Sequence, residues 1–180
     1  MQGWKKGKEW SDRFIPEIKQ ICELHLTGGA PVEEASIEED QKRHTDLIVL
    51  KMESLRIACR VRDTKFYIQY PDEITIRSIV PSGAKTELQK VIEGWGDYMF
   101  YGFSNEDETE LCAWKLCDLN VFRLWLSKES RKYKSSRWNV DIDNNDGTFF
   151  RAYNTNVLPG NFIFQCSPDK TKIFSTANIS

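Results

Sequence analysis

Apolar positions near the start of the chain recur at helical spacing. Between Ser11 and Leu26 they fall every three or four residues, for example at Phe14 and Ile18, which predicts an amphipathic helix. Proline is best tolerated in the first turn of a helix, so Pro16 places the expected start of this helix near Ile15.

The next apolar stretches follow the spacing of strands. Thr45–Leu50 and Leu55–Arg62 flank a short polar turn and predict a β-hairpin. Alternation along the second strand places Ile57, Cys59 and Val61 on one face. The opposite face then carries the arginines of that strand, so the two faces differ sharply in polarity.

The remaining pattern adds further elements of both kinds. Strands are expected over residues 65–70, 73–79, 97–103 and 111–119, and a hairpin around Asn145-Asp146-Gly147. The segment 97–103 is apolar on both faces, which is typical of a central strand. Helices are expected over residues 85–93 and from about residue 120. The sequence therefore predicts an α/β fold, with a mixed central sheet of roughly five or six strands and helices on its faces.

Composition narrows the class of protein. The chain has 180 residues, 40% hydrophobic and 29% charged, which is typical of a globular protein with a substantial core. Its net charge of -2 means that any nucleic-acid binding must use a local basic face. The five cysteines sit among apolar neighbours, and their odd number favours reduced, buried thiols and a cytoplasmic location. No run approaches the roughly 18 apolar residues of a membrane span, so no membrane association is expected.

The hairpin resembles the active-site hairpin of the PD-(D/E)xK nuclease-like superfamily. In that superfamily an Asp at the start of one strand and an acid-x-Lys triplet on the next strand hold a divalent metal against a phosphodiester. Asp46 fits the first position, whereas the second position reads Arg60-Val61-Arg62 and has an arginine in place of the acid. A helix leading into a Tyr-rich strand that opens with Asp97 strengthens the resemblance. The resemblance implies a restriction-endonuclease-like core over about residues 11–126 of a single domain, residues 1–180, similar to uncharacterised proteins of phages and mobile elements.

The resemblance also implies a set of site residues. Asp46, Arg60 and Arg62 take the catalytic positions, with Arg62 replacing the lysine as a phosphate clamp. A weakly bound Mg²⁺ or Mn²⁺ ion would need Asp46 and a relocated acid, for which Glu39 and Asp40 are the candidates beside Glu38 and Glu23. The alternative interpretation is that Asp46 forms a half-buried ion pair with one of the two arginines.

A basic segment and the C-terminal hairpin that follows it together occupy about residues 127–166. Lys132, Lys134 and Arg137 lie in it beside aromatic residues, a combination that can follow a phosphate backbone, although a solvated loop is the alternative. The sequence thus predicts a nuclease-like protein that acts on or binds DNA or RNA. The alternative is a catalytically inactive accessory factor that binds nucleic acid or a protein partner. The oligomeric state stays open.

Overall fold

The structure, a computed structural model, describes residues 9–26, 32–35, 47–49, 55–132 and 140–167, and for residues 47–49 and 130–132 only the backbone. One helix and six strands make up the first part of the fold: α2 (Ile15–His25), β1 (Val32–Glu34), β2 (Leu47–Val49), β3 (Leu55–Arg62), β5 (Tyr98–Ser104), β6 (Leu111–Asp118) and β9 (Ile163–Cys166). The second part comprises α4 (Thr64–Gln69), β4 (Glu73–Ile79), α5 (Glu87–Ile92), α6 (Leu119–Lys132), β7 (Ile142–Asp143), β8 (Phe149–Asn154) and the short 3₁₀ helix η2 (Thr155–Val157).

The central sheet is mixed. Its six strands follow the order β1-β2-β3-β5-β6-β9, and only the β3–β5 pair is parallel. A parallel pair needs a long crossover connection, and here α4, β4 and α5 supply it between the two strands. The predicted mixed α/β fold is therefore confirmed, as is the hairpin, because β2 and β3 pair antiparallel with Leu47 opposite Ile57.

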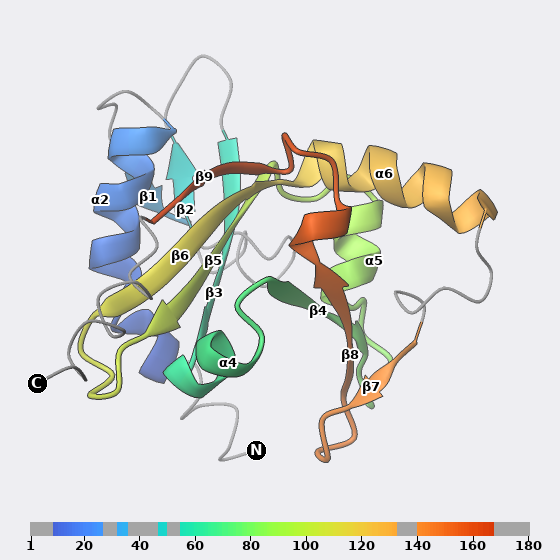
Figure 1. Cartoon of the computed structure of the whole chain (residues 1–180), viewed down its shortest axis with the longest axis horizontal. Coiled ribbons are helices and arrows are strands. Elements are labelled where there is room, and N and C mark those ends of the chain that lie inside the picture. Colours follow the sequence, from blue (N-terminus) through green and yellow to red (C-terminus); the bar gives the residue numbers. More distant parts are fainter. Residues whose placement is uncertain (1–8, 27–31, 36–46, 50–54, 133–139, 168–180) are drawn as a thin grey trace, which may run out of the picture.

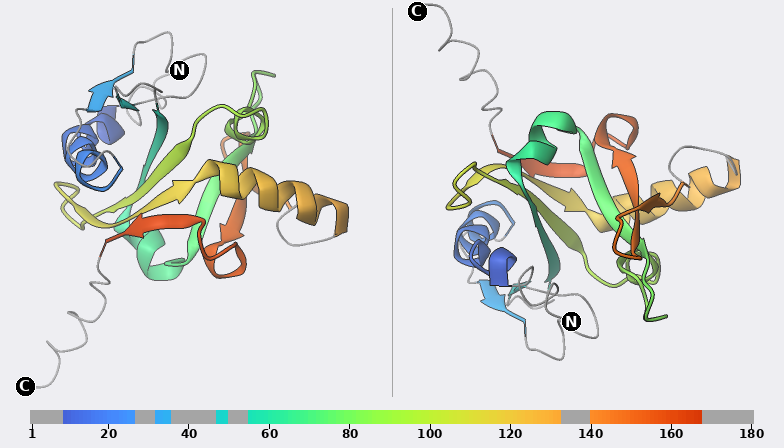
Figure 2. Two further views of the ribbon diagram at one scale, coloured as in Figure 1. Left: turned by 90° about the horizontal axis from the view of Figure 1, so that it is seen from above. Right: turned by 90° about the horizontal axis from the view of Figure 1, so that it is seen from below.

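A second, three-stranded antiparallel sheet was not predicted. Its order is β4-β8-β7, so the segment 73–79 is a strand as expected but does not belong to the central sheet. Figure 1 shows this sheet, α5 and α6 on one side of the central sheet, with α2 on the other. The views of Figure 2 agree and show α6 extending outward from the sheets.

Two apolar clusters lie on the opposite faces of the central sheet. On one face Ile18 and Cys22 of α2, with Phe14 at its N-cap, are buried against apolar residues of β3, β5 and β6. On the other face Tyr101 and Phe103 of β5 join apolar residues of β4, α5, α6 and β8. β5 contributes to both clusters, which confirms the prediction that it is a central strand buried on both sides.

Two predictions of local structure are wrong. Residues 65–70 are not a strand, because the side chain of Asp63 accepts a hydrogen bond from the Lys65 backbone N–H at 2.9 Å and starts the helix α4. The cysteines are all free thiols, as predicted, but they are not all buried. Cys22 and Cys117 are buried, whereas Cys166 on the edge strand β9 is exposed.

Candidate functional site

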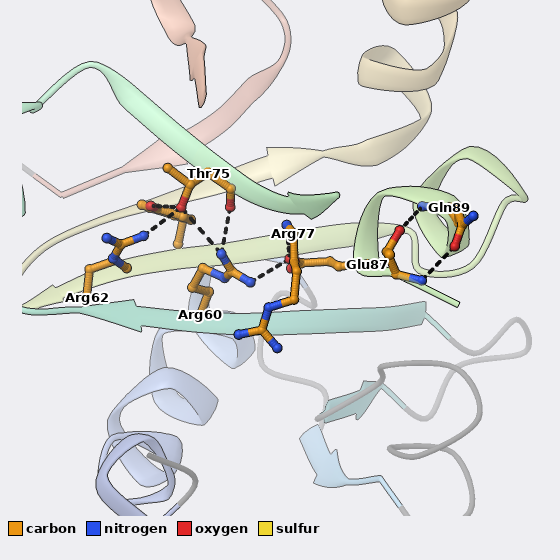
Figure 3. Close-up of polar contacts among 8 residues, drawn as sticks. Arg60, Arg62, Thr75, Arg77, Glu87 and Gln89 are labelled. Carbon is orange, nitrogen blue, oxygen red and sulfur yellow. Dashed lines mark hydrogen bonds and ion pairs between the residues drawn. The ribbon is translucent and has the colours of Figure 1, made fainter. Parts of the chain in front are cut away.

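The two faces of β3 differ as the alternation predicted. Ile57 and Val61 are buried in the cluster beneath α2. Arg56, Arg60 and Arg62 occupy the other face of the strand, which we call the arginine face. Figure 3 shows Arg60 and Arg62 rising from β3 toward β4 of the second sheet, so this face lies at the junction between the two sheets.

Arg60 is held by contacts to β4 and α5. Its guanidinium donates to the backbone oxygen of Thr75 at 2.9 Å and to the carboxylate of Glu87 at 2.5 Å. The same carboxylate oxygen accepts the backbone N–H of Arg77 at 2.9 Å. Arg60 thus binds the C=O of Thr75, and Glu87 binds the N–H of Arg77. These two backbone groups lie on the edge of β4, where a neighbouring strand would otherwise form hydrogen bonds. We call the Arg60–Glu87 pair the β4-edge clamp (Figure 3).

The position of Glu87 follows from the start of α5. The Thr86 hydroxyl caps this helix by accepting from the Gln89 backbone N–H at 3.2 Å, and the Gln89 side-chain oxygen accepts from the Thr86 backbone N–H at 2.8 Å. This capping box fixes Glu87 in the first turn, where the positive end of the helix dipole favours a carboxylate. The side chains of Arg60 and Glu87 are only 20% and 14% exposed, so both charges depend on this pairing.

Arg62 has a different set of neighbours. It donates to the hydroxyl of Thr75 at 2.7 Å, which also lies 3.0 Å from the hydroxyl of Tyr101. Its guanidinium carbon lies 4.0 Å from the centre of the Phe66 ring, in a cation–π contact. Burial lowers the pKa of the Arg62 guanidinium, and the hydroxyl of Tyr101 opposes this effect. An arginine starts from so high a pKa that the group stays charged at neutral pH.

The structure brings together only part of the predicted site. Arg60 and Arg62 lie side by side on one face, as predicted. The other predicted residues lie outside the described segments: Glu39, Asp40, Asp46, Lys134 and Arg137. Lys132 lies in the part of α6 for which only the backbone is described. The catalytic, metal-binding and phosphate-binding roles given to these residues stay predictions.

The register shows where Arg60 and Arg62 sit relative to the described part of β2. Leu47, Ile48 and Val49 pair with Ile57, Arg56 and Leu55 at the beginning of β3. Arg60 and Arg62 lie further along β3, where its other neighbour β5 places Tyr101 and Phe103 opposite them. Arg60 and Arg62 therefore lie beside β5, beyond the described part of β2.

A divalent metal does not fit the described residues of this face. Within the described segments, no group of three His, Cys, Asp or Glu side chains is placed to hold a metal ion. The carboxylate of Glu87 already binds Arg60 and the Arg77 backbone N–H. The guanidinium groups of the arginine face would also repel a cation.

Asp97 has a structural role at the start of β5. Its carboxylate accepts the Arg56 backbone N–H at 2.7 Å, and its own N–H donates to the Arg56 carbonyl at 2.8 Å. Its carbonyl accepts the N–H of Leu119 at 3.0 Å. These bonds extend the β3–β5 pairing to the residues just before its first ladder pair, Ile57 and Tyr98, so Asp97 caps the start of strand β5.

Two residues of the network were missed in the sequence. Glu87 follows Thr86 in a Thr-Glu-Leu-Gln stretch, whose capping-box pattern is a recognisable signal for the helix start. Nothing in that pattern indicates that Glu87 reaches an arginine on β3. Thr75 is 8% exposed and gives no sequence signal for its contacts to both arginines.

Comparisons with protein-family models, with curated proteins and with solved structures give no match to this chain. None of the helices in the described segments is both long and apolar enough to cross a membrane. The chemistry of the site is therefore inferred from its own residues. A row of guanidinium groups with one carboxylate among them can bind an anion with several oxygens, such as a phosphodiester.

Proposed function

We propose that the protein is a cytoplasmic, nuclease-like α/β protein that binds nucleic acid and uses Arg62 and Arg77 to contact the phosphate backbone. The observation that carries the proposal is the incomplete pairing of Arg62. Its charge is half-buried against a hydroxyl and an aromatic ring, and within the described residues no carboxylate lies at salt-bridge distance. The nearby Asp63 offsets part of the desolvation of this charge, and a bound phosphate would offset more of it.

Arg77 extends the same surface. Its backbone N–H is held by the β4-edge clamp, whereas its side chain is exposed and has no described carboxylate at salt-bridge distance. Arg60, in contrast, already binds Glu87 and Thr75. We therefore assign Arg62 and Arg77 to phosphate contact, and Arg60 to holding β4 against the central sheet.

Three features support a restriction-endonuclease-like core. The sheet is mixed, an antiparallel hairpin carries the arginine face, and the helix α5 leads through Asp97 into the Tyr-containing strand β5. Each feature belongs to the resemblance to PD-(D/E)xK nucleases. The described residues support binding of nucleic acid. Hydrolysis with Mg²⁺ or Mn²⁺ would in addition require Asp46 with Glu39 or Asp40. The alternative proposal is a catalytically inactive accessory factor.

Binding of labelled single-stranded and duplex oligonucleotides, followed by fluorescence anisotropy at several salt concentrations, tests the proposal. Arg62→Gln/Arg77→Gln should weaken binding to all sequences alike. It should also reduce the slope of log affinity against log salt by about two units, one for each lost phosphate contact. The matched control is Arg13→Gln/Lys19→Gln, which removes two positive charges from the region of α2 and should leave that slope unchanged.

Two results would contradict the proposal. If the wild type binds no oligonucleotide at low salt, the protein does not bind nucleic acid, and the protein-interaction alternative is favoured. If both double variants bind alike, the phosphate contacts lie elsewhere, and Lys132, Lys134 and Arg137 become the next residues to neutralise. Cleavage in the presence of Mn²⁺ that is lost in Asp46→Ala would distinguish an active nuclease from an inactive relative.

A further inference from the structure

The short helix α4 places the ring of Phe66 beside Arg62 and is followed by the exposed Tyr70. Ile68 is 73% exposed and Tyr70 is 43% exposed, while Phe66 is partly buried under the Arg62 guanidinium. Tyr70 donates its backbone N–H to the Phe66 carbonyl at 2.8 Å. Tyr70 is therefore the residue that ends α4, four residues after Phe66.

Packing against the apolar core fixes the orientation of α4. The ring of Tyr67 lies 5.1 Å from the ring of Phe103 on β5, so Tyr67 anchors α4 to the apolar cluster. Phe66 also packs partly against this cluster, under the Arg62 guanidinium. Ile68 and Tyr70 are the exposed large side chains of this segment.

We infer that α4 is a base-stacking surface and that the nucleic acid bound at the arginine face is single-stranded; this inference rests on the proposed function. A nucleotide combines a flat, largely apolar base with an anionic phosphate. Here the exposed Tyr70 ends the helix whose Phe66 ring lies 4.0 Å from the Arg62 guanidinium. Stacking on aromatic side chains requires unstacked bases, which a single strand offers and a duplex does not. The phosphate would lie on Arg62, and a neighbouring base on Tyr70.

The charges around α4 are of both signs. Lys65 is paired with Asp63 at 3.0 Å, so it adds little net charge. Beyond Tyr70, Asp72 is exposed and Glu73 is partly exposed, and Lys115 donates a hydrogen bond to the Pro71 carbonyl. The phosphate is therefore assigned to Arg62, whose guanidinium has no described carboxylate at salt-bridge distance.

Three probes of equal length, about 15 nucleotides, test this inference: a single strand, a duplex, and a single strand of abasic sites that keeps the phosphates but lacks bases. The wild type should bind the normal single strand most tightly. Tyr70→Leu should weaken that binding about 5- to 100-fold, because stacking on one aromatic side chain is lost. The same variant should leave binding to the abasic strand within about twofold.

Tyr70→Phe is the matched control, because it keeps the ring and should bind the single strand as the wild type does. Tighter binding of the duplex than of the single strand, or equal binding of Tyr70→Leu and the wild type to the normal single strand, would overturn the stacking inference while leaving the proposed function in place. No binding of any probe, including the duplex, would overturn the proposed function and this inference with it.

Discussion

The two faces of β3 are built on different physical principles. On the face toward α2, Ile57 and Val61 are buried among other apolar side chains, and their stabilisation depends on shape and on area removed from water. On the arginine face, each side chain must instead find a partner for a charge and for several N–H groups. A single strand thus joins a face that requires only packing to one that requires specific partners.

Arg60 and Arg62, both on the arginine face, differ in how completely their charges are paired. Arg60 has found its partners, because Glu87 neutralises it and the edge of β4 accepts its hydrogen bonds. Arg62 has a hydroxyl and a ring but no described carboxylate at salt-bridge distance. We therefore assign the fully paired arginine to the architecture and propose the other as the ligand contact. Residue type alone would have given both the same role.

Ile57→Ala on the apolar face should have the largest effect on stability. Ile57 is fully buried, so the substitution loses transfer free energy and leaves a cavity between β3 and α2. We expect the free energy of unfolding to fall by about 2 to 4 kcal/mol in urea denaturation. Ile92→Ala removes the same atoms from a side chain that is 55% exposed and should cost about 0.5 kcal/mol or less. Equal losses in the two variants would contradict the packing argument.

A double-mutant cycle on the β4-edge clamp should show a smaller but coupled effect. Arg60→Met should cost about 1 to 3 kcal/mol of unfolding free energy, because it leaves the Glu87 charge mostly buried and the Thr75 carbonyl without this donor. Glu87→Met should cost a similar amount, since it removes the acceptor of the Arg77 N–H. Urea denaturation of the single and double variants measures the coupling.

The double variant should be more stable than the sum of the two losses predicts, because neither charge then stays buried alone. Strict additivity would mean that the two residues act independently, and the clamp would then not be a unit. Retained nucleic-acid affinity in Arg60→Met, alongside lost affinity in Arg62→Gln, would confirm the division of roles between the two arginines.

The elements with a strong periodic pattern were predictable from the sequence. The hairpin, the central strand β5 and the helix starts near Ile15 and Thr86 all follow local rules that the fold does not override. The hairpin of β7 and β8 also follows its turn residues, with Asn145 and Gly147 both at positive φ. In these segments local preference and tertiary packing agree.

The wrong predictions have two sources: one local cap that the strand-like composition outweighed, and contacts between distant segments of the chain. Residues 65–70 are rich in residues that favour strands, yet the cap at Asp63 and the packing of Tyr67 on Phe103 make them a helix. The division of strands between two sheets depends on β4 pairing with β8, about 75 residues further along the chain. Glu87 joined the site for the same reason, because its contact with Arg60 exists only once α5 lies over β4. No local pattern encodes such contacts.

A third arginine, Arg151 on β8 of the three-stranded sheet, pairs with Asp141 just before β7. We expect this ion pair to be weaker than the β4-edge clamp. Its distances are 2.7 and 3.4 Å, and the two side chains are 25% and 28% exposed, more than those of the β4-edge clamp. The hydrogen bond from Arg151 holds the pKa of the Asp141 carboxyl below its ordinary value, assisted by Ser78. Because solvent screens this pair, it should contribute about 0.2 to 1 kcal/mol.

The pH dependence of Asp141→Asn should therefore be small and of definite sign. A carboxyl whose pKa is lower in the folded state stabilises the fold fully above its unfolded pKa, near 3.8, and loses that contribution as the pH falls through the folded pKa. The variant should thus be less stable than the wild type at neutral pH, and the difference should shrink toward zero in strong acid. Urea denaturation at neutral and acidic pH measures this difference, and a difference that stays constant across the range would assign the contact to packing rather than to charge.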